Sequence, residues 1–287
     1  MRTTQPRTTL ITDRDSAPIR RIRSLLTREA RERTGRYFVE GIRFLGEAVH
    51  HHAPIETLVV APKLLTHPFG QKLVRQERRL GVPCLEVTPE VFMSLSRAEE
   101  PQWVGAVLRQ QWERLAAVKP AEGLCWVAVE TVQTPGNLGT VLRTAEAVGA
   151  AGLILIGPAS DPYHPTAVRA TMGALFGQRI VRTTPSELAA WKERHGCLLV
   201  GTSPKASADY QAVRYSPPVV LCMGWERQGL SADQKALCDL MVRIPMAGRS
   251  DSLNLAVATG VLLYEVFNQR REGVGSAKEV SVAGPQS

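Results

Sequence analysis

The sequence predicts an α/β protein in two parts, the second of which holds a mostly parallel sheet with helices on both faces. Short apolar runs alternate with segments of helical periodicity along most of the chain. Beyond residue 122 these runs lack polar alternation, which is typical of parallel strands buried on both faces. Of the 287 residues, 44% are apolar and 22% are charged, an ordinary globular composition with room for about two domains.

Residues 1–110 predict a smaller α/β domain. An apolar stripe that includes Ile19, Ile22 and Leu25 predicts a helix over residues 17–34, and Gly35 stands where that helix would stop. Apolar runs predict strands over 37–40, 56–61, 83–87 and 103–108. Helical patterns lie between them, over 42–50, 69–80 and 89–96.

A polar stretch, 111–121, is the expected linker to a second domain over residues 122–270. The expected strands of this domain are 124–130, 152–157, 178–182, 197–201, 218–224 and 240–245. The expected helices are 138–149, 165–175, 186–194, 231–238 and 253–270. The remaining stretch, 271–287, lacks large aromatic residues and predicts a disordered tail.

Cysteine use and hydropathy point to the cytoplasm. The five cysteines are scattered and form no C-x-x-C pair, which argues against a disulfide framework or a zinc site. No uncharged apolar run approaches the roughly 18 residues that a membrane span needs, and no apolar segment follows the basic start as in a secretory signal. The sequence therefore predicts a cytoplasmic protein without a membrane partner or a metal.

The distribution of charge suggests a nucleic-acid partner. The formal net charge is +8, and residues 1–36 hold ten arginines against four acidic residues. Such a basic arm is the electrostatic footprint of a nucleic-acid binder, because each neutralised phosphate releases counterions. Charge alone leaves open a solvated basic helix that serves only solubility.

Common phosphate-binding and metal-binding fingerprints are missing. No G-x-G-x-x-G follows a predicted strand, which disfavours a dinucleotide-binding loop. Gly224 and Gly229 have the glycine spacing of a P-loop, but in the Leu230-Ser231 pair that follows them, Leu230 stands where the motif requires Lys. The three histidines 50–52 have no Cys or carboxylate partners at metal-ligand spacing and predict a polar helix end.

The segment 134–145 follows the first strand of the second domain. Here Asn137 is a candidate helix cap, and Arg143 lies four residues after Gly139. A helical side chain leans toward the N-terminus, so we expect the Arg143 guanidinium to pass over Gly139 and reach the loop at the strand end. An arginine on a solvated helix face is the alternative.

Two further segments follow predicted strands. In 222–231, two glycines flank Glu226, which suggests a loop whose backbone approaches a ligand; a plain turn is the alternative. In 244–258, Ser250 or Asp251 is the expected cap of a long apolar helix. The first turn of that helix would then hold Ser252 and Asn254, where simple capping is the alternative reading.

Together these three segments resemble a known family. N-x-G-x-x-x-R-T-A, G-x-E-x-x-G-L and I-P-M-x-G-x-x-x-S-L-N, in this order, are similar to motifs 1, 2 and 3 of the SpoU/TrmH ribose 2′-O-methyltransferases of the SPOUT superfamily. Residues 161–176 are similar to a further family segment. Residues 37–49 resemble the L30e-like RNA-binding domain that many members carry. Trp225 departs from the pattern, which often has Asn or Ser there.

The resemblance implies methyl transfer from S-adenosylmethionine (AdoMet) to a ribose 2′-hydroxyl of RNA. It also implies a trefoil knot in the second domain and a homodimer. Ribosomal RNA, 23S above all, is the expected substrate. A tRNA methyltransferase and a non-catalytic L30e-like RNA-binding factor are the alternatives. The first 110 residues would bind the RNA substrate.

The resemblance also implies roles for individual residues. Arg143 matches the catalytic arginine, and we favour an electrostatic role for it because a guanidinium stays charged in proteins. The other residues expected to shape the reaction site are Asn137, Glu226, Ser252 and Asn254. The expected cofactor contacts are Thr202, Met223, Gly224, Gly229, Ile244, Met246 and Leu253. The expected RNA contacts are Arg20, Arg21, Arg23, Arg36 and Arg169.

Overall fold

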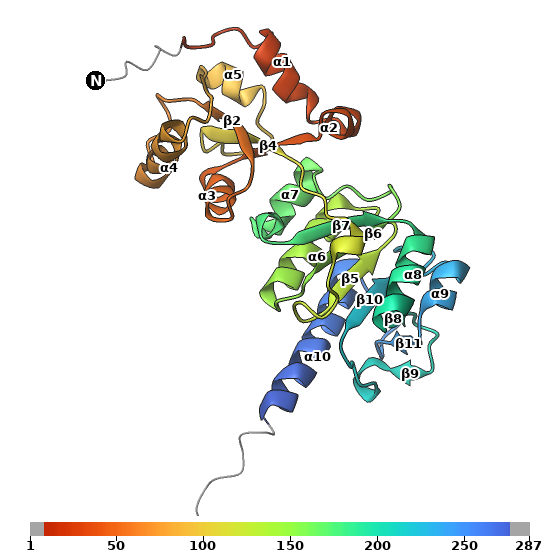
Figure 1. Ribbon diagram of the computed structural model, residues 1–287. Helices are drawn as coiled ribbons and strands as arrows, with labels where there is room; N and C mark the ends of the chain where they lie inside the picture. The colour runs from red at the N-terminus through yellow and green to blue at the C-terminus, as the bar shows by residue number, and fades with distance from the viewer. Residues whose placement is uncertain (1–8, 276–287) are drawn as a thin grey trace, which may run out of the picture. The chain divides into compact units, whose positions relative to one another are not determined.

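The structure is a computed structural model that describes residues 9–275. The chain divides into two compact units (Figure 1). The N-terminal unit holds the residues up to 111 together with 161–177, and the C-terminal unit holds 112–160 together with the residues from 178 onward. Both units are α/β, as the sequence predicts.

The N-terminal unit is built on a mixed four-stranded sheet of order β1-β4-β2-β3. β4 pairs antiparallel with β1 and β2, whereas β2 and β3 are parallel. The strands are β1 (Arg36–Glu40), β2 (Ile55–Val60), β3 (Cys84–Glu86) and β4 (Val104–Arg109).

Helices cover both faces of this sheet (Figure 1). α1 and α5 pack on one face, where Ile19 and Ile22 join Val59 and Val107 in a buried core. α3, which packs against α4, covers the other face and contacts β1 and β4. These helices are α1 (Ala17–Ser24), α3 (Ile42–His50), α4 (Pro68–Arg79) and α5 (Pro89–Met93).

The helix predicted over residues 17–34 is broken into α1 and α2 (Arg28–Thr34). Thr27 caps α2 by accepting a hydrogen bond from the Ala30 amide at 3.4 Å. The Arg31 guanidinium binds the two carbonyl oxygens freed at the break, those of Leu25 (2.8 Å) and Leu26 (3.0 Å). α2 ends, as predicted, at Gly35, whose φ of 64° lies in the left-handed region that glycine adopts without strain.

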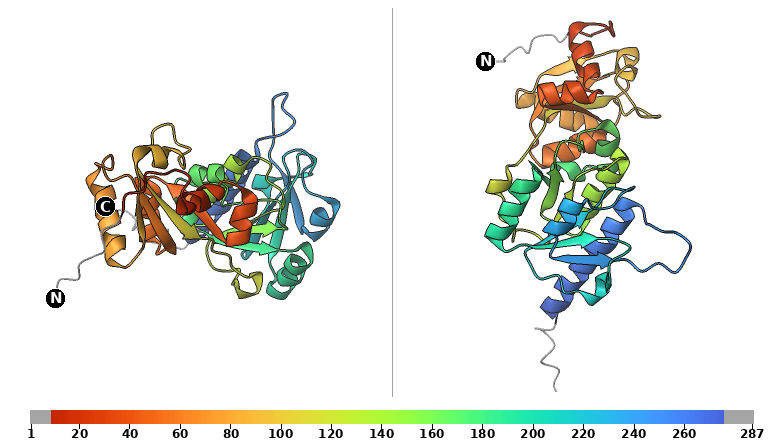
Figure 2. Two further views of the ribbon diagram at one scale, coloured as in Figure 1. Left: turned by 90° about the horizontal axis from the view of Figure 1, so that it is seen from above. Right: turned by 90° about the vertical axis from the view of Figure 1, so that its right-hand side faces the viewer.

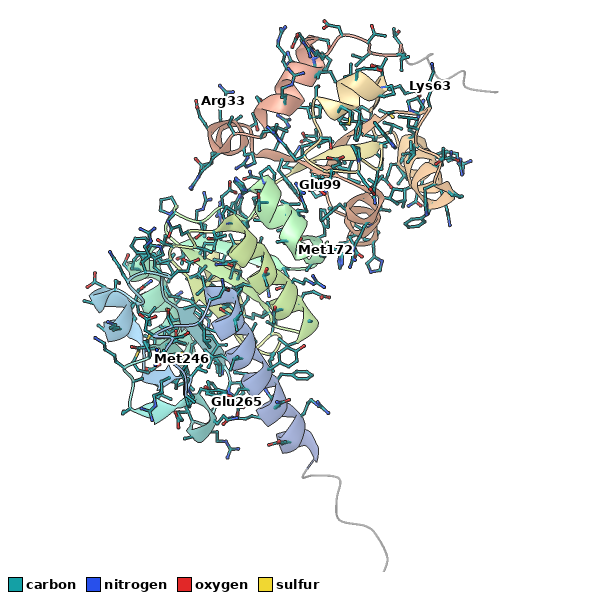
Figure 3. All side chains as sticks on the ribbon, turned by 180° about the vertical axis from the view of Figure 1, so that it is seen from behind. Arg33, Lys63, Glu99, Met172, Met246 and Glu265 are labelled. Atoms are coloured by element: carbon teal, nitrogen blue, oxygen red, sulfur yellow. The ribbon has the colours of Figure 1, made fainter. Side chains whose placement is uncertain are left out.

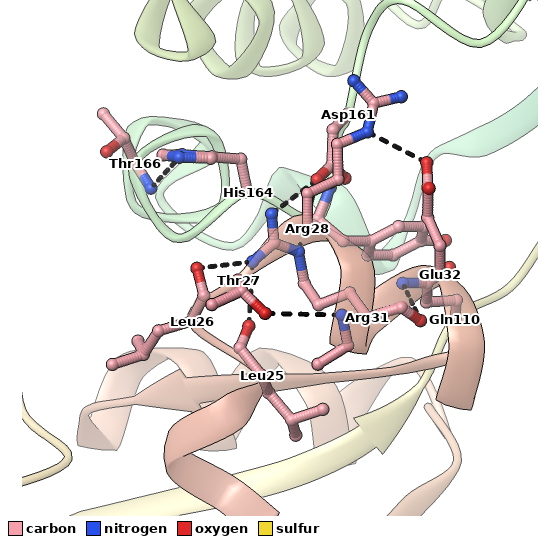
Figure 4. A network of polar contacts seen from close by, with 12 residues as sticks. Leu25, Leu26, Thr27, Arg28, Arg31, Glu32, Gln110, Asp161, His164 and Thr166 are labelled. Carbon is pink, nitrogen blue, oxygen red and sulfur yellow. Dashed lines mark hydrogen bonds and ion pairs between the residues drawn. The ribbon is translucent and has the colours of Figure 1, made fainter.

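The segment 161–177 belongs to the N-terminal unit, although the sequence places it in the second domain, residues 122–270. It contains α7 (Pro165–Thr171) and the 3-10 turn η2 (Ala174–Phe176). Arg31, only 1% exposed, forms an ion pair with Asp161 at 2.6 Å (Figure 4). The domain boundaries drawn from sequence therefore differ from the units of the structure in this segment.

Tyr163 provides further contacts between segment 161–177 and the rest of the N-terminal unit. Its hydroxyl donates to the Gln111 carbonyl at 2.5 Å and accepts from the Gln111 amide at 2.9 Å. Its ring packs against Tyr37, with ring centroids 4.6 Å apart. The segment is thus held by a buried ion pair, by two hydrogen bonds to the Gln111 backbone and by an aromatic contact.

The C-terminal unit holds a seven-stranded sheet of order β7-β6-β5-β10-β8-β11-β9, in which every pair is parallel. The predicted parallel sheet is confirmed, with one short strand, β9, that the sequence did not predict. The strands are β5 (Trp126–Val129), β6 (Gly152–Ile156), β7 (Arg179–Thr183), β8 (Leu198–Thr202), β9 (Ala208–Asp209), β10 (Val219–Met223) and β11 (Leu240–Arg243). The knot implied by the family resemblance stays a prediction.

Helices lie on both faces of the parallel sheet, as expected (Figure 1). α6 and α10 pack together, and they contact β6 and β10 respectively. α8, α9 and the 3-10 turn η1 lie on the other face, where Leu188 and Trp191 meet the core around Trp126. These elements are α6 (Pro135–Ala147), α8 (Pro185–His195), α9 (Ala232–Leu237), α10 (Leu255–Gly275) and η1 (Leu115–Ala117). A further 3-10 turn, η3, covers Tyr210–Ala212.

Two boundary predictions are wrong. The expected linker 111–121 is not a free spacer, because Leu115 is buried in the sheet core and Arg179 donates to the Glu113 carboxylate through Nε and Nη2. The expected tail begins too early, because α10 continues through Gly275. The rest of the predicted tail, 276–287, lies outside the described residues.

Candidate active site

A pocket of about 440 Å³ opens at the carboxyl ends of β8, β10 and β11. This edge is where ligands bind in open parallel sheets. The pocket brings together all seven residues expected to contact the cofactor: Thr202, Met223, Gly224, Gly229, Ile244, Met246 and Leu253. Figure 3 labels Met246, and Figure 2 shows the loop between β11 and α10, which carries Met246 and Leu253, reaching away from the sheet.

The loop after β10 is a tight hairpin. Trp225 and Gly229 exchange two backbone hydrogen bonds, of 3.0 and 2.8 Å. A Cβ on Gly224 would overlap the backbone of Leu230 and would lie 2.8 Å from the Gly229 Cα. The requirement for glycine at 224 therefore comes from the loop's own backbone, whereas the sequence suggested the approach of a ligand.

Gly224→Ala is expected to destabilise the C-terminal unit by about 3 kcal/mol, the upper end of what overpacking costs. Gly229→Ala is the matched control: its φ of 67° strains an alanine by about 1–2 kcal/mol, but a Cβ there meets open space. Urea unfolding of both variants measures the difference. Equal losses would show that Gly224 is not held by the backbone of residues 229 and 230.

A chain of hydrogen bonds joins the three motif segments. Asn137 on α6 donates to one oxygen of Glu226 at 3.1 Å, and the Gln133 amide donates to the other at 3.2 Å. Asn254 in turn donates its side-chain amide to Asn137 Oδ1 at 3.1 Å. The half-buried Glu226 carboxylate, itself part of the pocket wall, thereby fixes the loop after β5 against the loop after β10.

Two capping predictions need correction. Thr134 is the N-cap residue of α6, so Asn137 lies within the first turn and its side chain is free to bridge Glu226 and Asn254. α10 begins at Leu255, and Asn254 caps it by accepting from the Ala256 amide at 2.9 Å. Ser252 therefore lies in the loop before the helix, where it is exposed and lines the pocket.

Arg143 lies on the exposed face of α6 and is not among the residues that line the pocket. Within residues 9–275 its guanidinium forms no hydrogen bond or ion pair. Arg143 shares the exposed stripe of Thr140, while Leu138, Val141 and Leu142 face the core; the expected reach of its guanidinium toward the loop at the strand end stays a prediction. Its charge is fully available to a ligand or to another chain.

The predicted RNA-binding arginines differ in whether their guanidinium groups already bind other groups of the protein. Arg21 is exposed and its guanidinium has no partner in the described part of the chain. Arg20 and Arg169 are exposed, but each donates to a backbone carbonyl, of Asp15 and Arg97 respectively. The other two are more strongly engaged: Arg23 binds Asp15 and Ser94, and Arg36 pairs with Glu56.

Sequence reasoning missed several residues of the pocket wall. Lys205, Arg227 and Lys235 line it, and so does Trp225, which the family pattern had made doubtful. The Trp225 indole Nε1 is buried without a hydrogen-bond partner. Lys205, Trp225 and Arg227 lie in the loops directly after β8 and β10, a signal that could have found them, whereas Lys235 lies on α9.

Across residues 9–275 no group of three or more His, Cys, Asp or Glu side chains is placed to hold a metal ion. No helix in the same range has the length and apolarity to cross a membrane. All five cysteines are free, and burial raises the pKa of the Cys125 thiol to about 12, so it stays protonated.

Two family models match the chain. Residues 125–264 match the SpoU rRNA Methylase family, and residues 17–106 match the MRM3-like substrate binding domain. A 23S rRNA (uridine(2479)-2′-O)-methyltransferase of Streptomyces viridochromogenes is 34% identical over 86% of this chain and 87% of its own length. A 23S rRNA (guanosine(2553)-2′-O)-methyltransferase of Bacillus subtilis is 26% identical over 85% of this chain and 93% of its own length.

The crystal structure of a related protein has the same fold. The crystal structure of an AdoMet-bound rRNA methyltransferase from Sinorhizobium meliloti superimposes with a TM-score of 0.84 at 36% identity, covering 92% of this chain and 98% of that one. The three motif segments, of which the second and third line the pocket, all lie within the part of the chain that matches the methylase model. This chain belongs to the SpoU rRNA Methylase family.

Proposed function

We propose that the protein transfers the methyl group of AdoMet to a ribose 2′-hydroxyl of 23S rRNA. The observation that carries the proposal is that the second and third motif segments line one pocket at the carboxyl edge of the parallel sheet, with Asn137 of the first segment hydrogen-bonded to Glu226 in the pocket wall. The two named relatives that act on 23S rRNA each align with about 85% of the chain, including the substrate-binding part.

The pocket fits AdoMet in size and in chemistry. Its volume of about 440 Å³ lies within the roughly 300–1,000 Å³ of sites for ligands of this size. The backbone N–H groups of Ile244 and Met246 form no hydrogen bond within residues 9–275, and the Trp225 Nε1 is a buried donor without an acceptor. AdoMet, when bound, supplies a methyl group on a positively charged sulfur. Thr202, Met223, Ile244, Met246 and Leu253 would hold it.

The protein's own residues position the ribose and manage its charge. The bridge from Asn254 through Asn137 to Glu226 holds the loops beside the pocket in one arrangement, and such positioning can supply about 7–11 kcal/mol of barrier reduction. Ser252, exposed at the pocket wall, would orient the nucleotide. Arg143 would stabilise the oxygen as it loses its proton, since a fixed guanidinium favours developing negative charge.

We further propose that two copies pair through α6 and α10. Val257 and Tyr264 are about half exposed and lie seven residues apart on one face of α10. α6 packs on the same helix, where a Cβ on Gly260 would lie 3.7 Å from Thr144, the neighbour of Arg143. Pairing over this surface would cover the apolar stripe and bring the free Arg143 of one copy to the pocket of its partner.

Tyr264→Lys is expected to convert the dimer to monomers at micromolar concentration and to abolish methylation, because a charge would have to be buried in the interface. Leu80→Lys is the control, since Leu80 is 73% exposed at the C-cap of α4 in the other unit. Sedimentation of both variants tests the pairing. A wild-type protein that is monomeric yet fully active would refute it.

Arg21 and Arg33 carry the expected phosphate contacts of the N-terminal region. Both are exposed and neither has a partner in the described residues. Each substitution by Gln is expected to reduce the slope of log affinity against log salt by about 0.7–0.9. Arg36→Gln, which removes a guanidinium already paired with Glu56, should change the slope much less. Equal slopes in all variants would leave the basic residues as a solubility feature.

Methyl transfer from labelled AdoMet to purified RNA tests the function itself. We expect incorporation into unmodified 23S rRNA and none into 16S rRNA or tRNA. Incorporation into tRNA alone would favour the tRNA methyltransferase. Binding of 23S rRNA with no incorporation would favour the non-catalytic factor.

A further inference from the structure

A second pocket, of about 250 Å³, lies wholly within the N-terminal unit. Its walls come from the end of β1, the start of α3, the loop 95–102 and helix α7. Figure 3 labels Met172, the C-cap residue of α7, and Glu99, which lies in that loop.

The pocket has an aromatic and aliphatic floor. Phe38 and Phe44 line it and are only half buried. The Phe38 ring packs over Gly105, where a Cβ would lie 2.5 Å from the ring. Leu95 and Val168 complete the apolar lining. Ring faces that stay open to solvent can stack on a planar ligand.

Three arginines stand at the rim. Arg43, Arg97 and Arg169 all line the pocket and all are exposed. The guanidinium groups of Arg43 and Arg97 have no partner within residues 9–275. Arg169 uses one nitrogen to donate to the Arg97 carbonyl at 2.7 Å, which anchors it beside the loop. The rim therefore offers free positive charge to an anion.

The lining also includes two carboxylates and an amide. Glu40 is already engaged, because it accepts from Ser96 Oγ at 2.7 Å and from the Arg97 amide at 3.2 Å. Glu100 has no partner among the described residues and can accept from an exocyclic amine. Gln102 accepts from the Ile42 amide at 2.7 Å through its oxygen, which leaves its NH₂ group as a free donor.

We propose that this pocket binds a single unstacked nucleotide of the rRNA substrate, with the base against Phe38 and Phe44 and the flanking phosphates on the arginines. Aromatic stacking with charged or hydrogen-bonding rims is how proteins read unpaired RNA bases. The volume lies below the roughly 300–1,000 Å³ of sites for larger ligands, which favours one base over a whole cofactor. This inference rests on the proposed function, because it takes rRNA as the ligand.

Phe44→Leu removes the stacking face and keeps an apolar side chain in the floor. We expect it to weaken binding of a 23S rRNA transcript about tenfold, within the range of one lost base stack, with AdoMet affinity unchanged. Phe69→Leu is the matched control, since Phe69 is 48% exposed on α4 in the same unit and does not line this pocket. Arg43→Gln should lower affinity and flatten the salt dependence, whereas Lys63→Gln should do neither.

Crosslinking locates the contact directly. A 23S rRNA transcript that carries 4-thiouridine is expected to crosslink to the tryptic peptide that begins at Phe44. The proposal is overturned if Phe44→Leu and Phe69→Leu bind the transcript equally well. It is also overturned if Phe44→Leu weakens self-association of the protein and leaves its affinity for RNA unchanged. If the wild-type protein methylates 23S rRNA and Phe44→Leu is unaffected, only this inference fails. If the wild-type protein methylates no rRNA, the proposed function fails.

Discussion

Arg143→Ala is expected to reduce single-turnover methylation of rRNA by at least about two orders of magnitude, the usual cost of removing one donor that stabilises developing charge. The fold should survive, because Arg143 is exposed and alanine is the better helix former. The affinity for AdoMet should hardly change, because Arg143 does not line the pocket of its own chain.

Two further variants sharpen this test. Arg143→Lys should rescue activity poorly, since an ammonium group cannot reproduce the planar fork of a guanidinium. Arg194→Ala removes an exposed arginine from α8 in the same unit and should leave the rate unchanged. A near wild-type rate for Arg143→Ala would reduce Arg143 to a surface residue of α6.

Asp161→Ala is expected to destabilise the N-terminal unit by about 3–5 kcal/mol, because it leaves the buried charge of Arg31 without a counterion. It also removes the acceptor for the Tyr163 amide, which bonds to Asp161 Oδ1 at 2.9 Å. Urea unfolding gives the loss, and hydrogen exchange of the amides in β1 and β4 identifies the unit affected.

Glu32→Gln is the control for the Asp161 variant. It breaks the exposed i,i+4 pair of Glu32 with Arg28, which is worth only about 0.3–0.5 kcal/mol. Adding Arg31→Met to Asp161→Ala should recover part of the loss, since the unpaired charge is then gone. Similar losses for Glu32→Gln and Asp161→Ala would mean that the buried pair does not hold segment 161–177 in place.

The local pattern of the sequence was enough to predict most of the fold. Apolar runs without alternation mark strands buried on both faces, and these runs lie at all the C-terminal strands except the two-residue β9. Gly35 ends its helix as predicted, because a left-handed residue is a local requirement. The convergence of Thr202, Gly224 and Ile244 on one pocket followed from the motifs, since parallel strands end at one edge.

Long-range contacts explain what the sequence could not predict. Nothing near Asp161 in the chain indicates that its partner is Arg31, 130 residues away. The break after α1 depends on the same arginine, whose contact with the carbonyls of Leu25 and Leu26 competes with a continuous helix. The bridge from Asn254 to Asn137 likewise joins residues 117 apart, so each looked like a local cap.

Mapping of alkali-resistant bonds in 23S rRNA tests the central claim most directly. A methyl group on a ribose 2′-oxygen prevents that oxygen from attacking the adjacent phosphate, so alkali cannot cleave the chain there. After incubation of unmodified 23S rRNA with the protein and AdoMet, we predict one newly resistant nucleotide, absent without AdoMet and strongly reduced with Arg143→Ala. Incorporated methyl label with no newly resistant bond would place the methyl group on a base and contradict ribose 2′-O-methylation.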